Sequence, residues 1–431
     1  MNSNKSHLKV TSNLTEWSEK AVKYIAKIVG GGTPSTKISE YWNGDIPWIT
    51  PKDLSIQQHK YICKGLRNIT PDGLNKSSAK IIPSNSVILS TRAPVGYIAI
   101  SRRDITTNQG CHSLIPNNDM DTEFLYYLLL NNVEYLKSQS NGSTFGELSA
   151  KVLSELRFKL PTLKEQKAIA KILSDLDSNI ELNEKMNKTL EAIAQAIFKH
   201  WFIDFEFPDE EGKPYKSSGG EMVDSELGKI PKGWMVSNIG RELTTVLGGT
   251  PSTNKKDYWN GGNIPWINSG KINEFRIIKP SAYITPEALT NSATKMMPKG
   301  TTVLAITGAT LGKVSRIEVD MCANQSVIGI IENQLLPSEF IYFWVKSNID
   351  YLILNQTGGA QQHINKENVN ELRILIPSKE IMNKYIRMIK VMFDKISLSS
   401  FEEDDLSAIR DLLLPKLMTG KIRVPLEDEY E

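Results

Sequence analysis

Two pairs of side-chain amides, each flanked by basic residues, are the chemically most distinctive groups in this 431-residue chain. Asn108-Gln109 and Asn324-Gln325 could each donate to and accept from the edge of an adenine base. The alternative is that these amides form turn or strand-end hydrogen bonds, and we favour it because the pair occurs twice. Lysine and arginine side chains nearby could bind phosphates or guanine edges. The chemistry that these residues suggest is binding of a polyanion.

The sequence has no arrangement of residues that is typical of a catalytic site. It lacks a glycine-rich phosphate loop, a dinucleotide-binding fingerprint, a nucleophile elbow and the motifs of amino-methyltransferases. The five histidines show no ligand spacing, and His112 after Cys111 is better explained by packing than by metal binding. Cys63 and Cys322 are distant, so neither a disulfide framework nor a zinc site is predicted. We expect no catalytic residue, no metal and no cofactor in this chain.

The elements that position these groups occur twice, because the chain contains a long internal repeat at an offset of about 216 residues. A period of this length indicates a duplicated domain rather than a solenoid of short units. The repeated motifs are Gly31–Thr36 and Gly248–Thr253, Tyr41–Gly44 and Tyr258–Gly261, and Ile46–Ile49 and Ile264–Ile267.

Residues that are identical in two bodies cannot encode a difference between two targets. The repeated motifs are therefore expected to be scaffold or to bind phosphates without regard to base sequence, and their tryptophans (Trp42, Trp48, Trp259 and Trp266) to be core anchors. Base readers are expected where the halves differ, as in Thr50–Leu66 against Asn268–Lys279. The predicted DNA-contacting residues are Thr36, Lys52, Arg92, Tyr97, Arg102, Arg103, Asn108, Gln109, Ser143, Thr144, Lys255, Lys256, Asn268, Lys271, Thr307, Lys313, Arg316, Asn324, Gln325 and Gln361.

Each half is predicted to be a globular body of short strands followed by one long helix. Alternating or β-branched runs at residues 86–90 and 302–306 predict strands. Late in each body, residues 123–137 and 339–354 predict a helix, and residues 156–160 and 372–376 a last strand. Pro161 and Pro377 end these strands and suit the first turn of the helix that follows.

The two long helices carry a heptad pattern that predicts an antiparallel coiled coil. One seam runs through Ile169, Leu173, Leu176, Ile180, Asn183, Asn187, Leu190, Ala194, Ile197 and Trp201, and its equivalent runs from Tyr385 to Leu417. Polar residues at the centre of each seam, Asn183 and Asn187 against Ser399 and Glu403, would fix the register. The alternative is a local break in each helix. Ile169 to Trp201 would span about 48 Å at 1.5 Å per residue, which suits a spacer between DNA faces that recur every 34–36 Å or so.

Charge alternates along the chain in the same four segments. Residues 1–160 carry 19 Lys and Arg against 13 Asp and Glu, whereas residues 161–215 carry 7 against 11. Residues 216–377 carry 16 against 14 and residues 378–431 carry 9 against 11. Basic bodies favour a polyanion partner. The polar start and the absence of a long apolar run predict a cytosolic protein.

Two bodies alternating with two long helices resemble the specificity (S) subunit of type I restriction-modification systems. The likeness extends from about Trp17 to Val424 and includes Gly-Gly-Thr-Pro-Ser and Ile-Pro-Trp in each body, Leu160–Gln166, Ala194–Phe205 and Leu413–Ile422. It implies two target recognition domains, each of which reads half of a bipartite, asymmetric sequence in double-stranded DNA. It implies that the helices space these domains and dock two modification (M) subunits, which use S-adenosylmethionine to methylate adenine. Restriction (R) subunits, which use ATP and Mg²⁺, would join the complex.

The predicted fold is α+β, with two repeated α/β target recognition domains separated by two long antiparallel helices in a pseudo-twofold arrangement. The predicted domains are residues 1–160, 161–215, 216–377 and 378–431. One departure concerns docking: the central helix has Glu165-Gln166 where the second has Ile381-Met382, so the two helices could differ in how they dock M subunits. The alternatives are a symmetric protein–protein adaptor that does not bind DNA and a divergent DNA-modifying enzyme.

Overall fold

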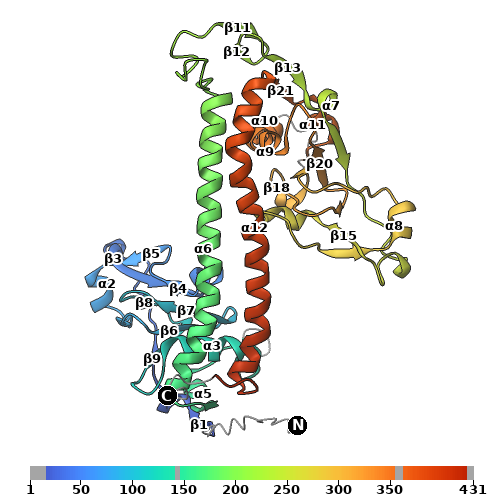
Figure 1. Cartoon of the computed structure of the whole chain (residues 1–431). Coiled ribbons are helices and arrows are strands. Elements are labelled where there is room, and N and C mark those ends of the chain that lie inside the picture. The colour runs from blue at the N-terminus through green and yellow to red at the C-terminus, as the bar shows by residue number, and fades with distance from the viewer. Residues whose placement is uncertain (1–15, 141–145, 355–362, 425–431) are drawn as a thin grey trace, which may run out of the picture. The chain divides into compact units, whose positions relative to one another are not determined.

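A computed structural model describes residues 16–140, 146–354 and 363–424. The chain forms two compact units, of which unit 1 is Met1–Glu181 with Asp405–Glu431 and unit 2 is Leu182–Asp404 (Figure 1). The predicted boundaries follow chain order, whereas the compact units divide inside both long helices. Each unit therefore contains one body together with a part of each helix.

The body of unit 1 is built on three sheets. A five-stranded sheet has the order β2-β9-β6-β7-β4, a three-stranded sheet the order β5-β3-β8, and β1 pairs with β10. These strands are β1 (Ser18–Ala21), β2 (Ala26–Gly30), β3 (Trp42–Ile49), β4 (Tyr61–Ile62), β5 (Arg67–Ile69), β6 (Val87–Thr91), β7 (Val95–Ser101), β8 (Thr106–Thr107), β9 (Cys111–Pro116) and β10 (Arg157–Leu160).

The body of unit 2 repeats this plan. Its sheets have the orders β14-β20-β17-β18, β16-β15-β19 and β13-β21. The parallel pair of Trp48 with Thr106 has its counterpart in Trp266 with Cys322. The strands are β13 (Met235–Asn238), β14 (Thr244–Leu247), β15 (Ile264–Ile267), β16 (Ala282–Ile284), β17 (Thr302–Ala305), β18 (Val314–Arg316), β19 (Cys322–Ala323), β20 (Val327–Ile331) and β21 (Arg373–Ile376), preceded by a hairpin of β11 (Met222–Ser225) and β12 (Gly228–Pro231).

Short helices connect the strands, and several begin with the same capping arrangement. Thr50, Thr70 and Thr285 accept a backbone hydrogen bond at the start of a helix whose first residue is proline. The threonine hydroxyl accepts from a backbone N–H of the first turn, which has no partner within the helix. Proline lacks a backbone N–H, but at the first position of a helix none is needed. The short helices are α1 (Pro51–Ile56), α2 (Pro71–Asn75), α5 (Ala150–Glu155), α7 (Ile239–Glu242), α8 (Pro286–Thr290), α11 (Lys366–Glu371) and the 3₁₀ turns η1 (Val22–Tyr24), η2 (Ser39–Tyr41), η3 (Lys256–Tyr258), η4 (Ser269–Asn273) and η5 (Gly308–Thr310).

The single helix predicted late in each body is in fact two helices. Unit 1 has α3 (Thr122–Asn131) and α4 (Val133–Ser138), and unit 2 has α9 (Ser338–Ser347) and α10 (Ile349–Leu354). The break falls at an asparagine in both cases. Asn132 donates its side-chain amide to Leu128 O at 2.7 Å, and Asn348 donates to Trp344 O at 2.8 Å. Such a bond competes with the backbone ladder and explains why the periodic pattern did not reveal the interruption.

The two long helices are continuous over 40 residues each, as α6 (Leu163–Phe202) and α12 (Lys379–Met418) (Figure 1). A local break at the polar centres is therefore wrong. Pro161 and Pro377 were expected in the first turn of these helices. Instead, they precede the capping residues Thr162 and Ser378, whose hydroxyls accept from backbone N–H groups of the first turn.

The pairing of α6 with α12 is antiparallel within each unit, as predicted. In unit 1, Ile169 near the start of α6 shares a core with Leu417 near the end of α12. In unit 2, Trp201 near the end of α6 lies with its ring 6.0 Å from that of Tyr385 near the start of α12. The heptad pattern thus identified the seam correctly.

The polar centre of the seam contains the predicted register contact. Asn187 donates to Glu403 Oε1 at 2.8 Å, and Asn187 and Ser399 are almost fully buried. Burial, together with the negative charge of Glu184, raises the pKa of Glu403 to about 7, because both disfavour the ionised carboxylate. No helix in the described ranges has the length and apolar content that crossing a bilayer requires.

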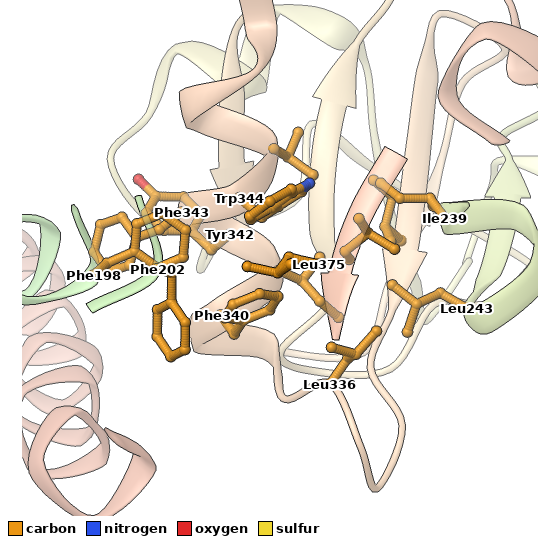
Figure 2. Packing of buried hydrophobic residues seen from close by; sticks show 14 of the residues in the cluster. Phe198, Phe202, Ile239, Leu243, Leu336, Phe340, Tyr342, Phe343, Trp344 and Leu375 are labelled. Carbon is orange, nitrogen blue, oxygen red and sulfur yellow. The ribbon is translucent and has the colours of Figure 1, made fainter. Parts of the chain in front are cut away.

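An aromatic core joins body and helices in unit 2. Figure 2 shows Phe198 and Phe202 of α6 beside Phe340, Phe343 and Trp344 of α9. Phe202 lies 4.9 Å from Phe340 between ring centroids, in an edge-to-face arrangement. Burial of so many rings supplies much of the apolar stabilisation that holds this body on α6.

Candidate functional site

The Gly-Gly-Thr-Pro-Ser segment lies close against the edge strand β8 in the first body and the edge strand β19 in the second. Gly32 donates its backbone N–H to Thr107 O at 2.8 Å, and Gly249 donates to Ala323 O at 2.8 Å. A Cβ atom on Gly31 would lie 2.0 Å from Asn108 O, and one on Gly248 would lie 2.1 Å from Asn324 O. Only glycine allows this approach, which explains why both halves use it.

Two tryptophans hold each segment in place. Trp42 and Trp48 meet edge to face at 5.0 Å, and their indole N–H groups donate to Ser35 O and Gly32 O. Trp259 and Trp266 repeat this arrangement at 5.2 Å, with bonds to Ser252 O and Gly249 O. All but the half-buried Trp259 are buried, which agrees with the predicted role as anchors.

The repeated amides divide into a structural and an exposed member. Asn108 Oδ1 accepts from Gly110 N at 2.9 Å, and Asn324 Oδ1 accepts from Ser326 N at 3.1 Å. Both asparagines therefore form turn bonds, as we favoured.

The glutamines of these pairs lie on the surface next to the glycine-rich segment. Gln109 Oε1 accepts from the hydroxyl of Thr33, and Gln325 Oε1 accepts from the hydroxyl of Thr250. Both glutamines are exposed. The same polar pair thus marks one edge of each body.

Most of the basic candidates in the first body lie on its surface. Lys52, Arg102 and Arg103 are exposed, as is Thr36, whereas Arg92 and Tyr97 are half-buried. Arg102 stacks on the ring of Tyr61 at 3.7 Å, which orders its guanidinium without removing it from solvent. Ser143, Thr144 and Gln361 lie outside the described residues.

The second body departs further from the prediction. Lys255, Lys256 and Lys313 are exposed and Thr307 is half-buried, while Asn268 caps η4 by accepting from Gly270 N at 2.9 Å. Lys255 donates to the hydroxyl of Tyr258, which raises the pKa of this lysine and keeps it charged. Lys271 is half-buried and pairs with Glu274 at 2.6 Å.

Arg316 is the clearest correction among the candidates. Its side chain is 10% exposed, its guanidinium pairs with Glu318 at 2.8 Å, and it lies near the ring of Phe393 in α12. A buried, paired arginine is not available to DNA, so its role is structural. Its position in a segment where polar and apolar residues alternate was compatible with either role in the sequence.

Arg67 was missed by the sequence analysis, and Lys60 was wrongly included in the range expected to read bases. Arg67 is exposed and stacks on Trp42 at 3.5 Å, beside the glycine-rich segment. In the sequence, Arg67 could have been recognised as a candidate by its position just after the divergent range Thr50–Leu66. Lys60 is buried between the body and α6, and no local sequence feature distinguishes it from a surface lysine.

The described residues present exposed cations but no cluster of three His, Cys, Asp or Glu side chains that could hold a metal ion. Burial raises the pKa of the Cys111 thiol and lowers the pKa of His112, so both side chains favour their neutral forms. Exposed cations on rigid strands and turns can contact phosphates and base edges.

Glu165 and Gln166, where the first long helix departs from the second, are used within unit 1. Glu165 pairs with Arg423 at 2.6 Å, and Gln166 accepts from Asp121 N at 3.0 Å. Their counterparts Ile381 and Met382 belong to the aromatic core of unit 2. The departure therefore changes internal packing and is a weak argument for unequal docking.

Comparison with known proteins gives a consistent result. The profile of the type I restriction modification DNA specificity domain matches residues 15–192 and 231–405. The type I restriction enzyme MjaIX specificity subunit of Methanocaldococcus jannaschii is 35% identical over 415 residues, covering 95% of this chain and 94% of the relative. The HindI specificity subunit of Haemophilus influenzae is 28% identical, covering 86% and 89%. A crystal structure of an S subunit from M. genitalium has a similar fold, with a TM-score of 0.60 at 16% identity, covering 95% and 98%.

Proposed function

This chain belongs to the family of type I restriction-modification specificity subunits, and we propose that it reads a bipartite, asymmetric DNA sequence with one body per half-site. In this proposal it also scaffolds two M subunits and the R subunits. The chain itself supplies no chemistry: S-adenosylmethionine, ATP and Mg²⁺ are used by its partners. It acts in the cytoplasm, where it meets double-stranded DNA.

The observation that carries this proposal is the way the two bodies share a scaffold and differ around it. Both hold a glycine-rich segment on two tryptophans and place an exposed Thr–Gln pair beside it. The residues around this common frame differ: Arg67 lies opposite Trp48 and stacks on Trp42 in the first body, whereas Ala282 lies opposite Trp266 in the second. A shared frame suits phosphate binding, which positions a protein on DNA, and different surroundings suit reading of two base sequences.

A binding experiment separates this proposal from the alternatives. The chain, alone and with M subunits, would be titrated with duplex DNA over a series of salt concentrations. A protein that contacts several phosphates loses affinity steeply as salt rises. An adaptor that does not bind DNA would retain its protein partners and show no such dependence. Methyl transfer or cleavage by the isolated chain would instead indicate an enzyme.

The target sequence itself can be read from a genome. Mapping methylated adenines in cells that carry the three kinds of subunit should give a motif with two fixed parts and an unspecified gap. A continuous motif would contradict reading by two separate bodies.

A further inference from the structure

Each body buries a cation against the long helices of its own unit, at strand positions that lie one residue apart in the repeat. Lys60 precedes Tyr61, which pairs in parallel with Ile100, and Arg276 precedes Ile277, which forms a parallel bridge with Ile317. Both cations are 4% exposed. Because a buried charge is costly unless it is paired and hydrogen-bonded, a buried cation beside the long helices in both bodies needs a reason.

In unit 1, Lys60 connects the body to α6. Its Nζ donates to Ser174 Oγ of α6 at 2.8 Å and lies 3.0 Å from Oε1 of Glu123 in α3. Ser174 in turn donates to the other oxygen of Glu123 at 2.5 Å. Lys60, Glu123 of α3 and Ser174 of α6 thus form a closed set of hydrogen bonds.

A second contact in the same unit reaches both long helices. Tyr127 of α3 donates to Asp177 of α6 at 2.5 Å, and Arg410 of α12 pairs with the other oxygen of Asp177 at 2.9 Å. The hydroxyl of Tyr127 is also 3.5 Å from Lys60 Nζ. The network therefore runs from Lys60 through α3 to the helix pair.

Unit 2 reaches the same result with different residues. Arg276 lies 3.6 Å from Glu318, whose second oxygen accepts from Ser397 of α12 at 2.9 Å. Tyr342 of α9 donates to Glu191 of α6 at 2.6 Å and lies near the guanidinium of Arg276. The body is again bonded to both helices around a buried cation.

We propose that Lys60 and Arg276 are positioning residues that fix the angle of each body on the helix pair, and thereby set the gap between half-sites that the protein accepts. Apolar contacts between body and helices are non-directional. A hydrogen bond weakens steeply when its angle is poor, so the buried network resists rotation that the apolar contacts would tolerate. The claim about the gap rests on the proposed function, whereas the claim about the angle of each body does not.

The geometry makes small rotations important. A body of this size has a radius of gyration of about 15 Å, so its outer surface lies roughly 20 Å from its anchor. A rotation of about 10° moves that surface by roughly 3.5 Å, which is about the rise of one base pair. Loss of an anchor should therefore be visible as tolerance of gaps that are one base pair too short or too long.

The first test measures gap selectivity with the full chain and its M subunits. Duplexes carry both half-sites with the native gap or with one base pair more or less, and compete for binding. Lys60→Met is expected to lower the preference for the native gap at least tenfold, and Lys60→Arg, which keeps a positively charged hydrogen-bond donor, to retain more of it. Lys76→Met makes the same chemical change at an exposed site and is expected to leave the preference unchanged.

The second test needs no DNA. Spin labels at Ser55 in the body and Asn179 in α6, both exposed and both in unit 1, report the distance between these elements in a chain with Cys63→Ser. Lys60→Met should broaden the distance distribution and Lys76→Met should not. Ser174→Ala removes only one bond to Lys60 and serves if Lys60→Met fails to fold; it should broaden the distribution less.

The outcomes are distinct. An unchanged distribution in both Lys60→Met and Ser174→Ala would overturn the anchoring role. If Lys60→Met broadened the distance distribution but left gap selectivity undiminished, the proposed control of the gap would be wrong. It would also be wrong if the variant weakened DNA binding equally at all three gap lengths. Absence of any DNA binding by the wild-type complex would refute the proposed function, and the spin-label result would still decide the anchoring role.

Discussion

At the residue scale, the exposed glutamines provide the simplest test of the division between shared and divergent surface. Gln109→Ala and Gln325→Ala each remove a group that both bodies place beside the glycine-rich segment. If this edge binds phosphate, each change should weaken binding about fivefold, which corresponds to about 1 kcal/mol for one hydrogen bond. The weakening should be the same for every DNA sequence.

Competition between the specific duplex and a library with randomised half-sites measures this effect. Arg103→Ala is the comparison, because this exposed cation has no counterpart among the shared motifs. A changed base preference in either glutamine variant would place these residues among the base readers instead.

Individual residues also show which roles could be assigned from the sequence and which could not. Asn108 and Asn324 were assignable to turns because the same pair occurs twice. Arg316 and Lys60 were not assignable, since their burial depends on Glu318 with Phe393 and on Glu123 with Ser174, partners that only the folded chain brings together. A charged residue has no local signature of burial, so the candidate site was predicted in outline but not residue by residue.

At the element scale, the long helices were predictable and the breaks near them were not. The seam follows a period of seven residues, a local regularity that survives any tertiary arrangement. The interruptions at Asn132 and Asn348 depend on single side-chain bonds to the backbone within an otherwise apolar helix. The division of the chain inside α6 and α12 is a property of packing between distant segments.

The polar centre of the seam predicts a dependence of stability on pH. The pKa of Glu403 is about 7 in the folded chain, above that of an unfolded glutamate. The folded state therefore binds the extra proton, so this contribution to stability is fully present below about pH 4.5 and is lost as the pH rises through about 7. Glu403→Gln keeps an acceptor for Asn187 and removes the titration.

Thermal unfolding at pH 5 and pH 8 measures this difference. The Glu403→Gln variant should be more stable than the wild type at pH 8, by on the order of 1 kcal/mol given that the half-buried group is partly screened by solvent. At pH 5 the two should be closer. Equal differences at both values of pH would contradict a titrating seam.

The length of the helices makes a second prediction at this scale. Removal of one heptad from α6 and the equivalent heptad from α12 shortens the pair by about 10 Å. The pairing within the seam is kept because both deletions preserve the seven-residue period. The gap in the recognised site should shorten by about three base pairs, and both half-sites should stay the same. Methylation mapping in cells that carry the variant would reveal an unaltered gap if the helices are not the spacer.

At the scale of the whole molecule, duplication of the body leads us to expect that the two halves of the proposed target are read independently. The five-stranded sheet and its neighbours in unit 1 contain no strand from unit 2, and the converse holds, among the described residues. Each body also carries its own scaffold of glycines and tryptophans and its own buried anchor. Each body therefore has its own sheets and its own scaffold, and is attached to a common pair of helices.

Exchange of the first body tests this independence. Residues 16–160 would be replaced by the matching segment of a related specificity subunit, with Lys60, Glu123 and Tyr127 retained so that the bonds to Ser174 and Asp177 persist. One half of the methylated sequence should change completely, while the other half and the gap should be retained. The reciprocal exchange of the second body is the matched control and should alter the opposite half. If either exchange altered both halves, the bodies would have to influence each other through the helices, and a rigid anchor at Lys60 and Arg276 would be the first feature to re-examine.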